Sequence, residues 1–198
     1  MDIISIILII LAYLMGSLSA AIIVCRLLGL GDPRDSGSGN PGATNVLRIG
    51  GKKAAILTLI GDMLKGVVPV LTAIMLDCEV DVVGLVALAA FVGHLWPAFF
   101  QFKGGKGVAT FFGVIYVMNW QLGVFATVTW ILVTSMFHIS SLSALITATV
   151  VPIYAFNFFP QQAVYLAIIC ALLILRHHKN IRQLISGEEN RLSSKKTS

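Results

Sequence analysis

The chain has 198 residues, of which 57% are apolar and only 12% are charged, and its mean hydropathy is +0.90. A soluble domain is about half apolar and carries about a quarter of charged residues, so this composition excludes an ordinary soluble protein and indicates an integral membrane protein. The net charge of +5 comes without the aromatic-basic interleaving of an RNA or DNA site, so it does not indicate nucleic-acid binding.

Apolar stretches recur along the chain, and a full membrane crossing needs about 20 such residues. The sequence predicts seven spans: Ile3–Cys25, Ala54–Leu76, Val82–Phe100, Val108–Asn119, Leu122–Phe137, Leu142–Phe158 and Ala163–Leu175. The fourth is too short for a straight crossing, so a re-entrant hairpin of the fourth and fifth, which leaves five spans, is the alternative. We expect an all-α polytopic membrane protein with one domain, residues 1–187, and a polar cytoplasmic tail, residues 188–198.

The basic residues predict the orientation of the spans. All Lys and Arg residues except Lys65 fall between spans one and two, between spans three and four, or after span seven. The turn on the opposite side carries three acidic residues, Asp77, Glu79 and Asp81. Because positive loops stay in the cytoplasm, the N-terminus is expected outside and the C-terminus inside, which requires an odd number of spans.

The first long connection, residues 28–53, is predicted to be a cytoplasmic loop that folds back onto the bundle. It is rich in glycine and in groups that bind phosphate or a polyol. They are Gly37, Ser38, Asn40, Thr44, Asn45 and Arg48. An arginine can grip a phosphate through two parallel hydrogen bonds. The bland alternative is an ordinary turn rich in Gly, Ser and Asn.

The second basic loop directly precedes the fourth predicted span and reads Gly104-Gly105-Lys106-Gly107. Glycines let the main chain approach an anion closely, and the free amides and dipole of a following helix favour negative charge. This spacing differs from that of a Walker loop. The loop is predicted to hold a phosphate, and a flexible basic turn that only sets topology is the alternative.

Other polar residues lie within or at the ends of the predicted spans. Asp62 and Lys65 are three residues apart on one helical face, which favours a pair that fixes helix packing over a direct ligand role. Ser141 and Ser143 lie at the turn before the sixth span, where they serve either as site residues or as helix caps. His94 is equally compatible with a buried, hydrogen-bonded side chain and a functional one.

The segment after the last predicted span offers a third group of possible substrate contacts. His177 and Asn180 are three residues apart and share a helical face. They follow the apolar stretch on the same side of the membrane as the two loops. The alternative is a basic sequence that only stops membrane insertion.

These residues resemble the bacterial acyl-phosphate:glycerol-3-phosphate acyltransferases, the PlsY family, over nearly the whole chain. The matching segments are Gly16-Ser17, Asp32-x-Arg34, Gly37 through Arg48, Asp62-x-x-Lys65-Gly66, Gly93-His94, Pro97, Phe102 through Thr110, Ser140 through Ser143 and Arg176-His177-x-x-Asn180-Ile181. The chain departs from the family at His138-Ile139 and at Glu188, where a threonine is expected. The two long loops are the most specific part of the match.

The resemblance implies a seven-span enzyme of the bacterial inner membrane with its active site facing the cytoplasm. It would transfer an acyl group from acyl phosphate to glycerol 3-phosphate, forming lysophosphatidic acid and phosphate in the first step of phospholipid synthesis. Neither coenzyme A nor acyl carrier protein would be the direct donor, and no cofactor or metal is expected. A soluble phosphate acyltransferase would supply the acyl phosphate.

Two sets of site residues follow from this resemblance and from the loop chemistry. The expected catalytic residues are Ser38, Arg48, Lys106, His177 and Asn180. The expected substrate-binding residues are Gly37, Asn40, Thr44, Asn45, Gly104, Gly105, Gly107, Ser141 and Ser143. The general base stays open between His177, with an ordinary histidine pKa near ~6.5, and an oxygen of a substrate phosphate, which the resemblance suggests.

Two rival functions are compatible with a basic, glycine-lined pocket. A small transporter for phosphate-bearing solutes predicts polar residues at mid-membrane in several spans and internal pseudo-symmetry, but only Asp62 and Lys65 approach this. A non-catalytic lipid-binding assembly protein explains the basic face. It does not explain two separate phosphate loops together with His177 and Asn180.

Overall fold

The computed structural model describes residues 1–192, and all regular structure in this part is helical. The elements are α1 (Ile3–Gly16), α2 (Ala20–Leu27), α3 (Ala43–Met75), α4 (Val80–Leu95), the short 3₁₀ helix η1 (Ala98–Phe100), α5 (Val108–Met118), α6 (Trp120–Phe137), α7 (Ser140–Phe158), α8 (Pro160–Arg176) and α9 (His178–Ser186). The expected all-α class is confirmed.

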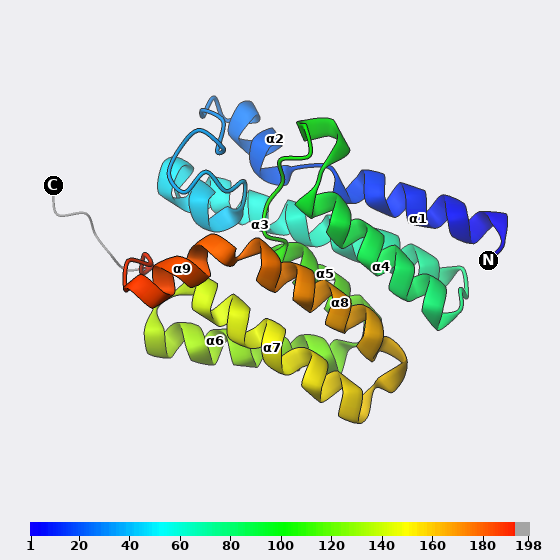
Figure 1. Ribbon diagram of the computed structural model, residues 1–198. Helices are drawn as coiled ribbons and strands as arrows, with labels where there is room; N and C mark the ends of the chain where they lie inside the picture. Colours follow the sequence, from blue (N-terminus) through cyan, green and yellow to red (C-terminus); the bar gives the residue numbers. More distant parts are fainter. Residues whose placement is uncertain (193–198) are drawn as a thin grey trace, which may run out of the picture.

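The helices form a bundle of long, apolar elements that fits a multi-pass membrane protein (Figure 1). By length and hydropathy, α3, α4 with η1, α6 and α7 can each cross a membrane. The pairs α1–α2 and α8–α9, bent by 44° and 57°, can each cross as one broken span, which gives four to six. The prediction of seven spans also requires the 11-residue helix α5, so the span count and the orientation stay predictions.

Local side chains define where several helices begin. The carboxylate of Asp2 accepts a hydrogen bond from the amide of Ser5 at the start of α1, at 2.8 Å. Asn119 accepts from the amides of Gln121 and Leu122 at the start of α6, at 3.0 and 3.2 Å. Such caps satisfy amides that have no partner in the helix itself.

The first long connection is shorter than the sequence predicts. Residues 43–53 were expected in the loop, but α3 already begins at Ala43. The helix contains one break, at Gly51, whose φ is +74°. The connection between the two helices is therefore residues 28–42. Arg48, which the sequence predicts in a loop, lies on the first turns of α3.

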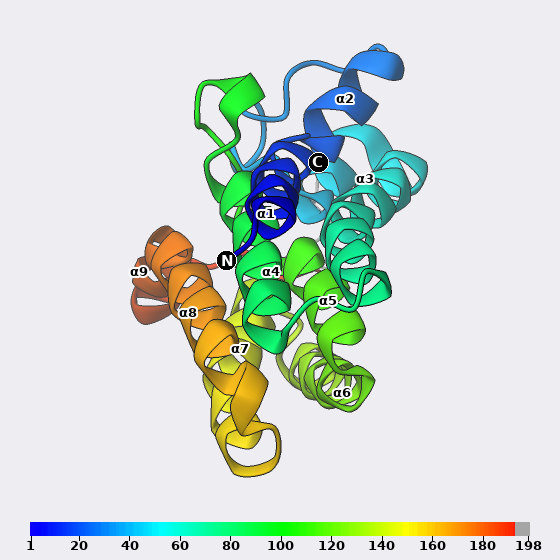
Figure 2. The same cartoon turned by 90° about the vertical axis from the view of Figure 1, so that its right-hand side faces the viewer.

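Helix α4 lies at the centre of the bundle, in contact with α1, α3, α5 and α8 (Figure 2). Close packing is possible because small residues face one another. A Cβ atom built at Gly16 of α1, for example, would lie 2.1 Å from the carbonyl oxygen of Ala90. The fully buried Phe91, Leu95 and Phe111 fill the core around α4. Small residues at such contacts are typical of helix pairs in membranes.

The polar connections gather at one end of the bundle. Figure 1 shows residues 28–42, the turn between α6 and α7, and α9 at the end opposite to the beginning of α1. The connection between α4 and α5, residues 96–107, rises above α4 and turns back across the bundle to the start of α5. Segments that are far apart in the sequence thus meet in one region.

Candidate functional site

The connection of residues 28–42, which we call the Asn45 loop, is organised by the side-chain amide of Asn45. The Oδ1 atom of Asn45 accepts a hydrogen bond from the amide of Ser38 at 2.9 Å. The Nδ2 atom donates to the carbonyl oxygens of Pro33 and Ser36 at 2.8 and 2.9 Å. Asn45 is buried, whereas Ser38 is exposed. Asn45 therefore shapes the loop and has little hydrogen-bonding capacity left for the substrate contact that the sequence predicts.

Gly37 is required at the tip of the Asn45 loop for two reasons. Its φ of +63° lies in the left-handed region that favours glycine. A Cβ atom at this position would lie 2.2 Å from Oδ1 of Asn45 and would displace the amide that holds the loop. Gly37 therefore acts through the shape of the loop, next to the exposed hydroxyl of Ser38.

The side chain of Arg34 connects the Asn45 loop to the segment between α4 and α5. The guanidinium of Arg34 donates to the carboxylate of Asp32, with Nη2 to Oδ2 at 2.7 Å. Nη1 of Arg34 also donates to the carbonyl oxygen of Phe100 at 3.3 Å. The hydrogen bond from Arg34 lowers the pKa of Asp32, so this carboxylate is ionised at neutral pH.

The connection of residues 96–107, which we call the Lys106 loop, is held between two helices. The amide of Gly105 donates to the carbonyl oxygen of His94, in α4, at 3.2 Å. From α8, Arg176 donates through Nε to the carbonyl oxygen of Gly105 at 3.1 Å and through Nη2 to that of Gly104 at 2.8 Å. The sequence predicts that the Gly105 amide is free to bind phosphate, but His94 already occupies it.

The close approach of His94 to the Lys106 loop explains why this loop contains paired glycines. A Cβ atom at Gly104 would lie 2.1 Å from the carbonyl oxygen of His94, and one at Gly105 would lie 2.4 Å from its Nε2. No main-chain hydrogen bond within residues 1–192 uses the amides of Lys106 and Gly107. These two amides, at the start of α5, are therefore the ones that can bind an anion.

Lys106 lies among several other charged side chains. Burial lowers its pKa to about 8, and the positive charges of Arg48, Arg176 and Lys179 add to this effect, while Glu189 opposes it. The charges of Arg48 and Lys106 are thus close enough to influence each other. The guanidinium of Arg48 is exposed and makes no hydrogen bond in the part of the chain that the structure describes.

His177 is buried at the junction of α8 and α9, next to this positive region. Its Nδ1 atom lies 2.8 Å from the carbonyl oxygen of Leu173. Because a carbonyl only accepts, Nδ1 carries the proton and Nε2 is left as an acceptor. Burial, first of all, together with Lys106 and Arg176, lowers the pKa of His177 to about 4, although the hydrogen bond to Leu173 opposes this. The imidazole is therefore neutral at pH 7.

A carboxylate from the end of the chain joins the same region. Oε1 of Glu189 accepts hydrogen bonds from Oγ of Ser141 and from Nδ2 of Asn180, both at 2.8 Å. The sequence predicts that residues 188–198 form a polar tail, but Glu189 is packed against two expected site residues. Residues 193–198 lie outside the described part of the chain. Oδ1 of Asn180 is buried and has no hydrogen-bond partner among the described residues.

The structure does not bring Ser143 into contact with this region's charged groups. Its hydroxyl accepts from Oγ1 of Thr134 at 2.7 Å and donates to the carbonyl oxygen of Ile139 at 3.0 Å. The side chain is fully buried. Ser143 therefore links α6 to α7, and the predicted substrate contact is replaced by this structural one. Asn40 lies in the Asn45 loop and Thr44 in the first turn of α3, and both are half-buried.

Sequence reasoning missed Arg176 and Glu189 as parts of the site. Arg176 was interpreted only as one of the basic residues that follow the last span, and Glu189 as part of the tail. For Arg176 the resemblance to the PlsY family carries a signal, because Arg176 precedes His177 in a matching segment. Their contacts join segments up to 72 residues apart, which no local pattern predicts.

A buried polar group next to the Lys106 loop consists of Asp62, Lys65, His94 and Thr110. We call it the Asp62 cluster. Nζ of Lys65 lies 2.9 Å from Oδ1 of Asp62 and donates to the carbonyl oxygen of Leu18, between α1 and α2, at 2.8 Å. Oγ1 of Thr110 donates to the main-chain oxygen of Asp62 at 2.9 Å and lies 3.2 Å from Nδ1 of His94. The expected packing role of Asp62 and Lys65 agrees with these contacts.

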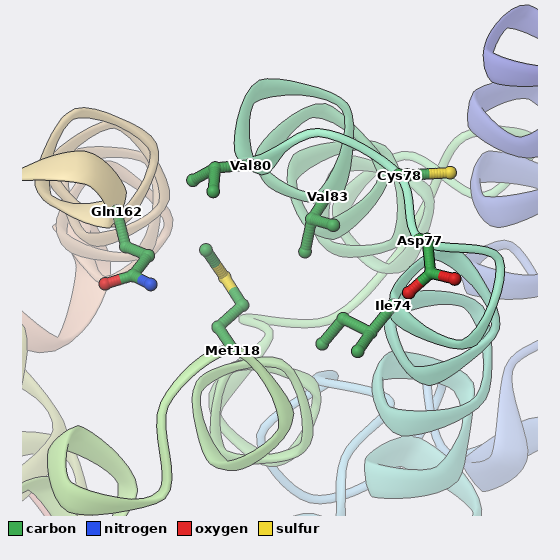
Figure 3. A pocket seen from close by; sticks show the side chains of 7 residues that line it. All are labelled: Ile74, Asp77, Cys78, Val80, Val83, Met118 and Gln162. Carbon is green, nitrogen blue, oxygen red and sulfur yellow. The ribbon is translucent and has the colours of Figure 1, made fainter.

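A cavity of about 310 Å³ lies at the other end of the bundle (Figure 3). Its lining residues are Ile74, Asp77, Cys78, Val80, Val83, Met118 and Gln162. Figure 3 shows apolar side chains around most of it, with Asp77 and Gln162 at the sides. Because the lining contains an acidic residue and no basic one, this cavity does not suit an anion.

Comparison with known proteins identifies the family. A family model described as glycerol-3-phosphate acyltransferase matches residues 6–187. A glycerol-3-phosphate acyltransferase of Vibrio campbellii is 49% identical over 196 residues, which cover 99% of this chain and 97% of the relative. One of Cronobacter sakazakii is 52% identical over 187 residues, which cover 94% and 91%.

Two solved structures have the same fold. Both are of PlsY (YgiH), an integral membrane glycerol 3-phosphate acyltransferase. The glycerol 3-phosphate form superimposes with a TM-score of 0.90 at 36% identity and covers 94% of each chain. The lysophosphatidic acid form does so with a TM-score of 0.88 at 35% identity and the same coverage. The chain therefore belongs to the PlsY family of glycerol-3-phosphate acyltransferases and is a multi-pass membrane acyltransferase.

Proposed function

We propose that this enzyme transfers an acyl group from acyl phosphate to the 1-hydroxyl of glycerol 3-phosphate, at the cytoplasmic face of a bacterial inner membrane. The products would be lysophosphatidic acid and inorganic phosphate. The observation that carries the proposal is the electropositive region around Lys106, where Arg48, Arg176 and Lys179 outnumber the carboxylate of Glu189. Both proposed substrates carry phosphate and repel each other, so a common cationic site is what brings them together.

The Lys106 loop suits the phosphate of the acyl donor. The amides of Lys106 and Gly107 have no main-chain partner in residues 1–192, and the ammonium of Lys106 adds a full positive charge. A phosphate bound there places its acyl carbonyl near the apolar helices, where the acyl chain can extend into lipid. Hydrogen-bond donors fixed in advance are effective because they need no reorganisation during the reaction.

The Asn45 loop suits glycerol 3-phosphate. Arg48 has an exposed guanidinium on the first turns of α3, and Ser38 presents an exposed hydroxyl. Asn45 and Gly37 hold Ser38 in place through the amide of Ser38. We assign Asn45 a positioning role in place of direct substrate contact. The relatives' structures in glycerol 3-phosphate and lysophosphatidic acid forms support this pairing of substrate and product.

The chemical step needs a nucleophile, a leaving group and a proton acceptor. The 1-hydroxyl oxygen attacks the carbonyl carbon of the acyl phosphate, and the bond from that carbon to the phosphate oxygen breaks. The hydroxyl proton is transferred to the departing phosphate. Because Nδ1 of His177 carries the proton, its Nε2 can accept a hydrogen bond from the hydroxyl, but a pKa of about 4 makes it a weak base. His177 therefore orients the hydroxyl, and the substrate phosphate is the general base.

Asn180, in α9, and Ser141, in α7, complete the proposed site. Both donate to Glu189, which fixes their side chains. The buried Oδ1 atom of Asn180, which has no partner within the described residues, can accept a hydrogen bond from a hydroxyl of glycerol 3-phosphate. In this arrangement Glu189 positions the residues that contact the substrate.

The direct test uses the purified protein with synthetic acyl phosphate and glycerol 3-phosphate. We expect equal amounts of inorganic phosphate and lysophosphatidic acid, without any accessory protein. Acyl coenzyme A and acyl carrier protein thioesters serve as the matched donors, and neither is expected to support turnover. Turnover with a thioester but not with acyl phosphate would overturn the proposed donor and leave the family assignment intact. Adding a soluble phosphate acyltransferase to the thioester reactions would test the source of the donor.

A further inference from the structure

The Lys106 loop is closed at its base by the Asp62 cluster. His94 lies in the last turn of α4 and Thr110 in the first turn of α5, so they flank the loop on either side. The single hydroxyl proton of Thr110 is donated to the main-chain oxygen of Asp62. Nδ1 of His94, 3.2 Å from the same hydroxyl, is therefore the donor in that contact. Two ends of a loop that are bonded to each other leave little freedom at its base.

The peptide group between Gly104 and Gly105 is fixed from both sides. Its carbonyl oxygen accepts from Nη2 of Arg176, and its N–H donates to the carbonyl oxygen of His94. In a trans peptide the C=O and N–H bonds point in opposite directions, and the structure contains no cis peptide bond among the described residues. Arg176 and His94 thus hold opposite edges of one rigid plane.

The next peptide group, between Gly105 and Lys106, is held on one edge only. Its carbonyl oxygen accepts from Nε of Arg176 at 3.1 Å, while its N–H has no main-chain partner in residues 1–192. Because the peptide is planar and trans, a carbonyl that points at Arg176 directs the N–H away from Arg176. The orientation of the Lys106 amide is therefore set by a side chain that lies 70 residues further along the sequence.

The guanidinium of Arg176 is well suited to this role. Its Nε and Nη2 donors form a rigid planar fork, which matches two consecutive carbonyl oxygens. The ring of Trp96 lies against it, with 5.8 Å from the guanidinium carbon to the ring centre. A lysine at this position would carry its three donors on one nitrogen, without the planar fork that fixes both carbonyl oxygens in one orientation.

We propose that Arg176 is a positioning residue which directs the N–H of Lys106 toward the phosphate of the acyl donor. This inference rests on the proposed function, because it takes the Lys106 loop as the donor's phosphate site. In this role Arg176 binds the Lys106 loop and does not contact the substrate. The main alternative, in which Arg176 binds a phosphate directly through its charge, makes a different prediction for a lysine in its place.

The test compares Arg176→Lys and Arg176→Met with a control, Arg182→Met, in which an exposed arginine of α9 is changed. Because the lost orientation removes one charge-assisted hydrogen bond, we expect both Arg176 variants to raise KM for acyl phosphate about ten- to a hundredfold. We expect KM for glycerol 3-phosphate to change less than threefold. Arg182→Met is expected to leave both values unchanged.

Binding of an acyl phosphonate, measured by calorimetry, separates this inference from the proposed reaction, since it needs no turnover. We expect Arg176→Lys to bind it about ten- to a hundredfold more weakly than wild type, with an unchanged melting temperature in detergent. Wild-type affinity in Arg176→Lys would show that the charge alone is needed and would overturn the inference. An equal rise in both KM values would overturn it as well. Failure of the wild-type protein to release phosphate would instead contradict the proposed function. If Arg176→Met does not fold, Arg176→Lys still decides the question.

Discussion

The two loops of the site are fixed by different means. The Asn45 loop is held by side chains from its own neighbourhood, because Asn45 bonds to residues at most 12 positions away and Arg34 pairs with Asp32 two positions away. The Lys106 loop is held by Arg176, which lies 71 and 72 positions from the two carbonyls that it contacts. The first loop is specified locally, and the second exists only when α4, α5 and α8 are assembled.

The two loops are therefore expected to respond differently to mutation. Loss of the hydrogen bonds made by Asn45 is expected to disturb mainly the Asn45 loop, which contacts the Lys106 loop through Arg34 and Phe100. The Lys106 loop is supported by the buried Asp62 cluster and by α8, so changes far from it in the sequence reach the proposed phosphate site. The following predictions test this contrast, from the largest expected effect to the smallest.

Lys106→Met is expected to reduce kcat/KM about 10²–10³-fold, because a positive charge aimed at a phosphate in a partly buried site is lost. Steady-state kinetics with acyl phosphate varied would measure it. Lys103→Met is the matched control, since Lys103 lies in the same loop, is exposed, and its side chain makes no hydrogen bond or ion pair with the described residues. Equal losses in the two variants would mean that the charge of the loop matters and its geometry does not.

Asn45→Ala is expected to lower the free energy of unfolding by about 2–4 kcal/mol, since three hydrogen bonds worth about 1 kcal/mol each are lost. The kinetic effect should appear mainly in KM for glycerol 3-phosphate. Unfolding in mixed detergent micelles would measure the stability. Asn157→Ala, at an exposed helical position, serves as the control. A larger rise in KM for acyl phosphate than for glycerol 3-phosphate would break the contrast between the loops.

The pH dependence tests the electrostatics of the Lys106 loop. The folded pKa of Lys106 is about 8, so its ammonium is present below that pH and is lost above it. We expect kcat/KM for acyl phosphate to fall as the pH rises through about 8. The falling limb should disappear in Lys106→Arg, because a guanidinium stays charged.

The same profile tests the role of His177. With a pKa of about 4, this imidazole is neutral from pH 5 to 9, so no limb near pH 6.5 is expected. A limb near pH 6.5 that vanishes in His177→Ala would support His177 as the general base and contradict the proposed use of the substrate phosphate.

Asp32→Asn is expected to have the smallest effect, below about threefold in kcat/KM. The pair with Arg34 is partly exposed, at 25% and 28% of the side-chain surfaces, and such pairs contribute about 0–1 kcal/mol. The difference from wild type should shrink further in 1 M salt because of screening. An effect above tenfold would indicate that the link from Arg34 to Phe100 holds the two loops together.

The sequence by itself determined the membrane class, the helical fold and the segments that meet at the site. Apolar runs and the two glycine-rich segments act over a few residues, so their signals are readable in the chain. Asn45 and Gly37 were found for the same reason, although the structure gives Asn45 a role in holding the loop.

Only the tertiary structure decided which groups remain available to a substrate. The Gly105 amide is used by His94, the hydroxyl of Ser143 bridges α6 and α7, and Glu189 returns to bond Ser141 and Asn180. Each of these contacts depends on how helices pack against one another. A hydrogen-bonding group has a fixed capacity, and whether the folded protein has already used it is set by neighbours that the local sequence does not contain.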